Sequence, residues 1–454
     1  NRVDLGGTLN ASGAHGGSIS LTGSRGDVAG SLTATGSSGP GGAISIGAKE
    51  INLSDASLNA SGATGGGSIA IGFTGSGASR NVNADTVFVS AGSTLKADAI
   101  ESGNGGRIEF WSNLATDYRG TMSAKGGAAS GDGGFLEVSS KGEVGFWGAA
   151  DASAPMGAAG MLSLDPKNIT ISTFGGGGLG SNPLTFGTSS TSSQTISPNS
   201  ITSVLNTGTA VTLQASNDIN ISSSISVNNP GGNGGHLTMQ AGRSVIFNNG
   251  ADITTDNGNL TIIANELLSA GVVNSQRDPG SAVITMNSGS EINAGSGSVR
   301  LAILNGAGKT NSTSGDLTVR TIQAGNILIE NLGATAGSDV NIASGSLIAS
   351  GTGTPLVVAA QNGTFDNDAG SGAMQTPNGR WLVYTNTPAA TNEGGLAGTP
   401  FYNTTYNPAN PTGISATGNK FAYTLAANLT VTPNNASREY GAANPAFTYT
   451  ITGL

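Results

Sequence analysis

The sequence predicts an all-β fold in which short repeats stack into a parallel β-helix, or solenoid, with a small C-terminal β module. Three observations lead to this prediction. A cassette of a small pair, followed by two apolar residues around one variable position, recurs along the first third of the chain. Glycine, at 74 of 454 residues, is about twice as frequent as the ~7% usual in proteins. Charged residues make up only 10%, against roughly 25% in ordinary domains.

The cassettes define a regular array over residues 1–166. Alternation of apolar and variable positions indicates a strand, and the glycine pair before it indicates a turn. The copies begin 25, 25, 39, 28 and 26 residues apart, at 16–21, 41–46, 66–71, 105–110, 133–138 and 159–164. A second apolar-first cassette precedes most of the glycine pairs, at 9–13, 32–36, 58–62 and 122–126. Each repeat therefore supplies about three short strands with glycine corners between them.

Two ways of stacking these strands are open. Antiparallel hairpins would build a sandwich or barrel, whereas coiling each repeat into one turn would build a parallel β-helix with strands about 4.8 Å apart. Very short strands, glycine corners and Ile, Leu, Val and Ala at matching interior positions favour the β-helix. Stacking in register also brings like residues together, which suits Asn, Ser and Thr but not charges, because opposed like charges destabilise a sheet. The low content of charged residues agrees with such in-register stacking.

Residues 167–208 are predicted to be a loop-rich insertion with one short helix. Ile201, Val204 and Leu205 have the i, i+3, i+4 spacing of one helical face, and Gly208 follows where a C-cap would lie. Residues 209–385 return to looser β-helix repeats. Several of their strands follow an Asn or Asp at the corner, where these residues tolerate left-handed backbone geometry.

The last segments differ in character. Residues 386–428 are predicted to be a Pro/Asn/Thr-rich connector with short strands, and 429–454 to be the start of a β module. Because an isolated two-stranded piece is marginal, either a following segment is missing or its strands pair with another element or another chain. The residues expected to mediate such assembly are Tyr440, Phe447, Tyr449 and Ile451.

Several stretches of the chain carry a resemblance to a known family, at 108–112, 135–139, 151–155, 164–171, 380–384 and 418–423. They resemble the filamentous-haemagglutinin-like exoproteins of two-partner secretion, and residues 429–454 are similar to the start of an MBG-type β repeat. The resemblance implies a right-handed β-helical rod, exported by an outer-membrane secretion partner and secreted or displayed on the outer surface of a Gram-negative bacterium. The secretion domain of that family is not matched, and Asn1 opens directly into repeat sequence, so we expect the chain to be a piece of a longer precursor.

One tripeptide is a candidate adhesion site. Arg25, Gly26 and Asp27 form an RGD sequence, which can dock integrins from a loop by presenting the arginine as a cation and the aspartate as a metal-bound carboxylate. The alternative is a plain corner between two repeats, which a glycine-rich chain contains many times. The structural alternative is the stronger expectation, and receptor binding is kept as a hypothesis.

No catalytic, metal or cofactor site is predicted. Glu109 and Glu137 share a cassette position and could stack at the spacing of glycosidase carboxylates, but a surface ladder of ion pairs is the expected arrangement. Asp132 lies in a Gly-Asp-Gly-Gly sequence that lacks the tandem recurrence of calcium-binding repeats. The histidines, His15 and His236, are far apart in the chain, and the glycine run at 175–180 lacks the strand and helix of a dinucleotide site.

The expected function is therefore non-enzymatic: an extracellular rod acting as an adhesin shaft or surface fibre subunit, which self-associates through its C-terminal strands. The expected partners are the secretion partner, an unknown host or neighbouring-cell receptor or glycan, and further copies of the chain. A net charge of −9 without a basic run excludes a nucleic-acid partner, and no apolar run is long enough to span a membrane. The alternative is a stalk of a toxin-delivery or carbohydrate-active exoprotein whose activity lies outside this chain.

Overall fold

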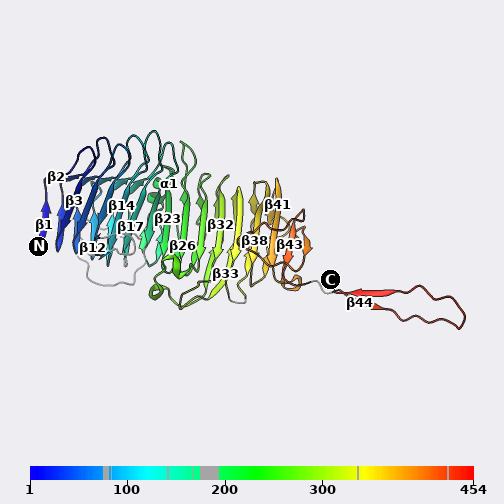
Figure 1. Ribbon diagram of the computed structural model, residues 1–454. Helices are drawn as coiled ribbons and strands as arrows, with labels where there is room; N and C mark the ends of the chain where they lie inside the picture. The colour runs from blue at the N-terminus through cyan, green and yellow to red at the C-terminus, as the bar shows by residue number, and fades with distance from the viewer. Residues whose placement is uncertain are drawn as a thin grey trace.

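The computed structural model describes residues 1–74, 81–82, 84–140, 143–165, 167–173, 194–334, 337–426 and 429–453. These residues form short strands stacked side by side along a rod, with the first strands at one end and a separate hairpin projecting beyond the other (Figure 1). Consecutive strands of a repeat enter different sheets, and within the five stacked sheets each strand pairs in parallel with its neighbours from adjacent repeats. The predicted all-β architecture of stacked parallel strands is confirmed, and it is compatible with a β-helix or solenoid.

One sheet, the long sheet, runs through most of the chain. Within the described residues it contains 15 parallel strands. In sheet order they are β3 (Ser18–Thr22), β6 (Ala43–Gly47), β9 (Ser68–Ile71), β14 (Arg107–Ser112), β17 (Phe135–Ser140), β20 (Met161–Asp165), β23 (Ala210–Ala215), β26 (Leu237–Ala241), β29 (Leu260–Ala264), β32 (Ser298–Ile303), β35 (Asn326–Asn331), β38 (Gly353–Ala360), β41 (Gly379–Thr385), β43 (Lys420–Tyr423) and β42 (Thr399–Phe401).

Two further sheets accompany the N-terminal half of the long sheet. The first side sheet contains β1 (Arg2–Leu5), β4 (Arg25–Val28), β7 (Glu50–Leu53), β12 (Thr86–Val89), β15 (Ala115–Tyr118) and β18 (Glu143–Phe146). The second side sheet contains β2 (Thr8–Asn10), β5 (Ser31–Thr33), β8 (Ser57–Asn59), β13 (Thr94–Lys96), β16 (Thr121–Ser123) and β19 (Ala149–Asp151). A small antiparallel hairpin, β10 (Phe73–Thr74) and β11 (Asn81–Val82), leaves the stack between two repeats.

Two other sheets take over in the C-terminal half. The third side sheet contains β22 (Gln194–Ile196), β21 (Ile169–Ile171), β24 (Ile219–Ile221), β27 (Val245–Phe247), β30 (Ala282–Met286), β33 (Ser314–Val319), β36 (Val340–Ile342) and β39 (Phe365–Asn367). The fourth contains β25 (Ile225–Ser226), β28 (Ile253–Thr254), β31 (Glu291–Asn293), β34 (Thr321–Ala324), β37 (Leu347–Ala349) and β40 (Met374–Gln375). The described residues also form three short 3-10 helices, η2 (Leu268–Ala270), η3 (Asn274–Gln276) and η4 (Pro388–Ala390).

Side chains at equivalent positions of successive cassettes stack on one another. Ile19 pairs with Ile44, and the register continues through Ile69, Ile108 and then Leu136. The last four of these residues are at most 1% exposed. Because side chains alternate across a strand, a slip of one residue would turn this whole row toward solvent. The repeated apolar pattern therefore sets the register of the long sheet.

The glycine pairs are required by close packing of backbones. An ideal Cβ on Gly42, Gly67, Gly106 or Gly134 would lie only 1.9 to 2.1 Å from the carbonyl oxygen of the equivalent glycine one repeat earlier. That oxygen accepts the backbone N–H of the residue after each glycine, for example from Arg107 to the Gly67 oxygen at 2.9 Å. None of these four glycines has positive φ. Glycine is therefore required here because it has no side chain, and not because its backbone can adopt a left-handed conformation.

Corner Asn and Asp residues have a different role from the predicted one. We expected left-handed backbone geometry, but Asp218, Asn259, Asp316 and Asp339 do not have positive φ. Each instead accepts a backbone N–H from the next repeat, at 3.1 Å from Ser244 to Asp218, for example, and the other three bonds are 2.7 to 3.1 Å long. Their side-chain oxygens thus link successive corners where the strand ladders end.

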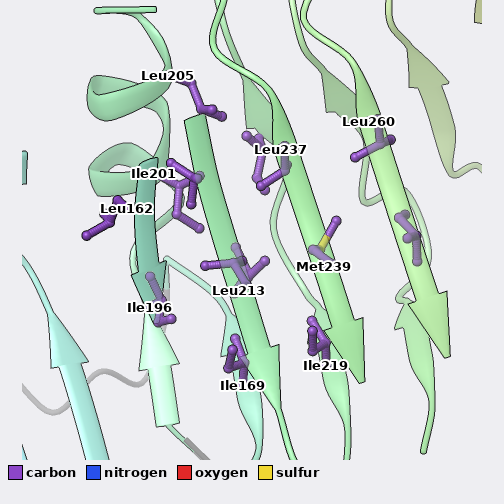
Figure 2. Packing of buried hydrophobic residues seen from close by; sticks show 14 of the residues in the cluster. Leu162, Ile169, Ile196, Ile201, Leu205, Leu213, Ile219, Leu237, Met239 and Leu260 are labelled. Atoms are coloured by element: carbon purple, nitrogen blue, oxygen red, sulfur yellow. The ribbon is translucent and has the colours of Figure 1, made fainter. Parts of the chain in front are cut away.

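The predicted short helix is confirmed as α1 (Pro198–Leu205). It begins after Ser197 with proline in its first turn, and Gly208, with φ +83°, lies two residues beyond the C-cap Asn206. Figure 2 shows Ile201 and Leu205 pointing from the helix toward the long sheet. The helix contacts β19, β23 and β25, so it lies between the last strand of the second side sheet and the first strand of the fourth. Its residues Ile201, Val204 and Leu205 join the apolar interior there.

One buried hydroxyl in the core lacks a hydrogen-bond partner. The Tyr118 ring is stacked on Phe146 and lies edge-on to Phe110, with centroid distances of 5.6 and 5.2 Å. Among the buried side-chain nitrogen and oxygen atoms of the described residues, the Tyr118 hydroxyl is the one without a hydrogen-bond partner. Burial raises the pKa of Tyr118 well above its ordinary value, so the hydroxyl stays protonated.

Tyr118→Phe is therefore expected to stabilise the protein. An unsatisfied buried polar group costs about 1–3 kcal/mol, and the substitution removes that group without opening a cavity. The measurement is the thermal unfolding midpoint, which we expect to rise. Tyr423→Phe is the matched control, because the buried Tyr423 hydroxyl donates to Glu393 at 2.7 Å and its loss should lower the midpoint. A lower midpoint for Tyr118→Phe would contradict the assignment.

Candidate binding and assembly surfaces

The C-terminal hairpin is the most exposed apolar feature of the described chain. Strands β44 (Thr430–Pro433) and β45 (Tyr449–Thr452) pair antiparallel, with Val431 opposite Ile451 and Pro433 opposite Tyr449. Because these four residues alternate with threonines in both strands, one face of the hairpin is apolar and the other is covered by threonine. Val431, Tyr449 and Ile451 are 53%, 62% and 47% exposed. Nothing in the described part of the chain covers the apolar face.

The tip of the hairpin turns at a tyrosine-glycine pair. The N–H of Ala442 donates to the Glu439 oxygen at 3.1 Å, which closes a four-residue turn. Gly441 occupies the third position of that turn with φ +84°, a value that favours glycine. Tyr440 is fully exposed there, and Phe447 is 80% exposed where the chain returns. All four predicted assembly residues are thus exposed on this hairpin.

Residues 429–454 match the MBG domain (YGX type). The tyrosine-glycine turn at Tyr440 and Gly441 lies within the matched segment. No curated protein matches the chain. An MBG-type segment at the end of long sheets of parallel strands fits an extracellular, repeat-rich, adhesin-like protein. The MBG-type hairpin is the part of this chain that a known family describes.

The RGD tripeptide lies in a strand and not in a loop. Arg25, Gly26 and Asp27 begin β4, and Gly26 is buried. The Arg25 guanidinium binds Asp27 at 2.7 Å and Glu50 at 3.0 Å, so the two charged ends of the tripeptide are paired with each other. This pairing holds the pKa of the Asp27 carboxyl below its usual value. The strand position agrees neither with display on a loop nor with a plain corner between two repeats, and receptor binding by the tripeptide stays a prediction.

The two glutamate carboxylates that lie side by side in the long sheet accept hydrogen bonds from neighbouring side chains. Glu109 and Glu137 lie opposite each other in β14 and β17, as their shared cassette position predicts. Glu109 binds Arg107 at 2.8 Å, whereas Glu137 accepts from the Trp111 indole and the Ser139 hydroxyl, both at 2.9 Å. Glu109 thus forms a surface ion pair as expected, whereas the indole and hydroxyl donors to Glu137 are neutral.

Two further sequence candidates, Asp132 and His236, accept backbone hydrogen bonds from other repeats. The Asp132 carboxylate accepts the N–H of Ala158 at 2.8 Å, which is the same corner link that other repeats make. His236 accepts the N–H of Asn259 at 3.0 Å. In the described ranges no cluster of three or more metal-ligating side chains occurs, and no helix is long and apolar enough to cross a membrane. The glycine run at 175–180 lies outside those ranges.

A second core was missed by sequence reasoning. Residues 402–416, here called the flap, fold over the outer face of the long sheet at β35, β38 and β41. The buried apolar residues of this layer are Val357, Ala359, Leu382, Tyr384, Tyr406, Ile414 and Ala422. Tyr384 donates to the Pro411 oxygen at 2.9 Å, and the Arg380 guanidinium donates to the oxygens of Ile414 and Ala416. The segment predicted as a connector also supplies β42 and β43 to the long sheet.

The flap also closes over a buried carboxylate. Glu330 is 1% exposed, and it binds the Arg300 guanidinium at 2.8 Å and the Tyr406 hydroxyl at 2.7 Å. Burial first, and then the negative charge of Glu330 and the hydrogen bond to it, raise the pKa of Tyr406. The sequence signal for this contact was weak, since Arg300 and Glu330 only share an outward-facing side of adjacent strands, and Tyr406 comes from an irregular segment.

Proposed function

We propose that the protein is a non-enzymatic extracellular rod that acts as an adhesin shaft or surface fibre subunit. In this proposal the stacked sheets close into a right-handed β-helix, and the chain is a filamentous-haemagglutinin-like exoprotein exported by a two-partner system to the outer surface of a Gram-negative bacterium. The observation that carries the proposal is an uncovered, amphipathic MBG-type hairpin placed beyond a long stack of in-register parallel strands.

The mechanism is geometric. Fifteen strands spaced about 4.8 Å apart give a rod roughly 70 Å long. The continuous apolar interior and the corner links resist bending, because each repeat is bonded to both neighbours. A receptor or glycan would be bound by corner loops, which vary in length between repeats.

The hairpin supplies the contact for self-association. Both of its strands are edges, so their outer N–H and C=O groups are open to pairing with another strand. Its apolar face would be covered at the same time, which adds hydrophobic burial to main-chain hydrogen bonds, as in β-strand addition. We therefore infer that one copy docks its hairpin against a neighbouring copy and that repetition of this contact builds a fibre.

Charging the apolar face should abolish assembly. We expect the wild-type protein to form concentration-dependent oligomers or fibres, and Tyr449→Lys with Ile451→Lys to remain monomeric, because two cations cannot be buried in that contact. Sedimentation velocity and negative-stain electron microscopy measure the outcome. The control is Thr450→Lys with Thr452→Lys, which adds the same charge to the threonine face and should preserve assembly. Single, non-assembling rods for the wild-type protein would remove the fibre proposal.

A further inference from the structure

Two excursions of the chain leave the stack and meet each other. Residues 265–281 connect β29 to β30, and 304–313 connect β32 to β33. The Leu268 N–H donates to the Ala307 oxygen at 3.1 Å, and the Asn274 amide exchanges two hydrogen bonds with Thr310, at 2.8 and 2.9 Å. The excursions therefore behave as one double loop, and the groups at its base are held in fixed positions.

A lysine and an asparagine amide meet at that base. Lys309 is 8% exposed and Asn265 is fully buried. The Lys309 Nζ lies 3.0 Å from Asn265 Oδ1 and 2.6 Å from the Gly242 oxygen. The Asn265 Nδ2 donates to the oxygens of Leu304 and Ser312, at 2.8 and 2.9 Å. An amine and an amide carbonyl are thus pressed together out of contact with bulk water.

The environment of Lys309 favours its neutral amine. Burial first, and then the cation of Arg277, lower the pKa of Lys309 to about 8, while Glu266 opposes the shift. Arg277 is 2% exposed and donates to the same Gly242 oxygen at 3.1 Å. With a pKa of about 8, about a tenth of the amine is neutral at pH 7. This is far more than for a surface lysine, whose ordinary pKa is 10.5. A neutral, desolvated amine is a nucleophile.

We propose that Lys309 and Asn265 join in an intramolecular isopeptide bond. The Nζ lone pair attacks the Asn265 side-chain carbonyl carbon, and a C–N bond forms. The proton that Nζ loses passes to Nδ2 within the tetrahedral intermediate, in which both nitrogens are bonded to the same carbon. The bond from that carbon to Nδ2 then breaks and ammonia leaves. One amide is exchanged for another, so the step balances without an oxidant, a cofactor or a second substrate.

The geometry supports the departure of ammonia. The two backbone oxygens of Leu304 and Ser312 already accept from Nδ2, so they can hold the leaving nitrogen as it gains a proton. The new bond would close a loop from residue 265 to residue 309 and tie both excursions covalently to the stack. Such a link constrains the unfolded chain and so stabilises the folded one. The proposal is independent of fibre formation.

Mass spectrometry of the full chain tests the bond. We expect the wild-type protein to weigh less than its sequence by one ammonia, and proteolysis to yield one branched peptide containing both Asn265 and Lys309. Lys309→Arg keeps the cation but cannot form the amide, because the guanidinium stays protonated. This variant should therefore have the full sequence mass. Lys167→Arg is the control, because Lys167 binds Asp278 at 3.2 Å and should leave the branched peptide intact.

The pH dependence tests the part played by the neutral amine. We expect the loss of ammonia and the branched peptide to form faster at pH 9 than at pH 7, because more of the Lys309 amine is neutral at the higher pH. The proposal is overturned if wild-type Asn265 and Lys309 appear in separate, unmodified peptides even after incubation at pH 9. It is equally overturned if the missing ammonia maps to a succinimide at another asparagine.

Discussion

Gly106→Ala is expected to destabilise the protein by about 3 kcal/mol, the upper end of the cost of overpacking. An ideal Cβ on Gly106 would lie 2.0 Å from the Gly67 oxygen and 2.8 Å from the carbonyl carbon of Gly66. These are backbone atoms, and the Gly67 oxygen is fixed by its bond from the Arg107 N–H. Neither side can move without breaking the ladder of the neighbouring repeat, so the strain cannot relax locally.

The measurement is thermal unfolding followed by circular dichroism, with the midpoint expected to fall by several degrees or more. Gly232→Ala is the matched control, since Gly232 has no heavy atom within 4 Å of its ideal Cβ and lies in an exposed turn. The control should unfold within about 0.5 kcal/mol of the wild-type protein. Equal midpoints for both variants would show that the corner is looser than the structure indicates.

Arg300→Met is expected to destabilise the flap by about 3 kcal/mol. Removing one partner of a buried ion pair typically costs about 3–5 kcal/mol, because it leaves a buried charge uncompensated. Glu330 is 1% exposed and would keep only the Tyr406 hydroxyl, although Arg300 itself is 38% exposed, which places the effect at the lower end. Hydrogen exchange of residues 402–416 and the unfolding midpoint measure the change, and both should report loosening of the flap.

A double-mutant cycle isolates the charge. Glu330→Gln removes the negative charge but still accepts the Tyr406 hydroxyl, so adding it to Arg300→Met should restore most of the lost stability. If the two substitutions simply add, the ion pair is not coupled and the explanation fails.

Much of the stack could be predicted from sequence because its causes are local and repeated. Alternating apolar residues predicted the strands of the cassettes, and their equal spacing predicted that Ile108 would lie against Leu136. The helix α1 followed from the spacing of three apolar residues. The role of the corner Asp and Asn residues was predicted wrongly, since left-handed tolerance is a property of one residue, whereas the observed bond joins two repeats.

The candidate surfaces were predicted less completely. The exposed residues of the MBG-type hairpin were predicted, because aromatic and apolar residues in a two-stranded piece have no interior to enter. The RGD tripeptide was expected at a corner between repeats or on a loop and not in a strand, since a tripeptide sequence says nothing about the strand that pairs beside it. The flap was not predicted, because its apolar residues are scattered through a Pro/Asn/Thr-rich segment without periodicity.

The sequence alone determined the class of fold, the positions of the strands and the register of the apolar rows, since these depend on a period of two within each strand and on near-constant spacing between repeats. The tertiary structure decided which irregular segments meet. Tyr406 reaches Glu330 across 76 residues, and Lys309 reaches Asn265 across 44. Such contacts depend on the path of non-repeating loops over the sheets, and no local pattern of side chains encodes that path.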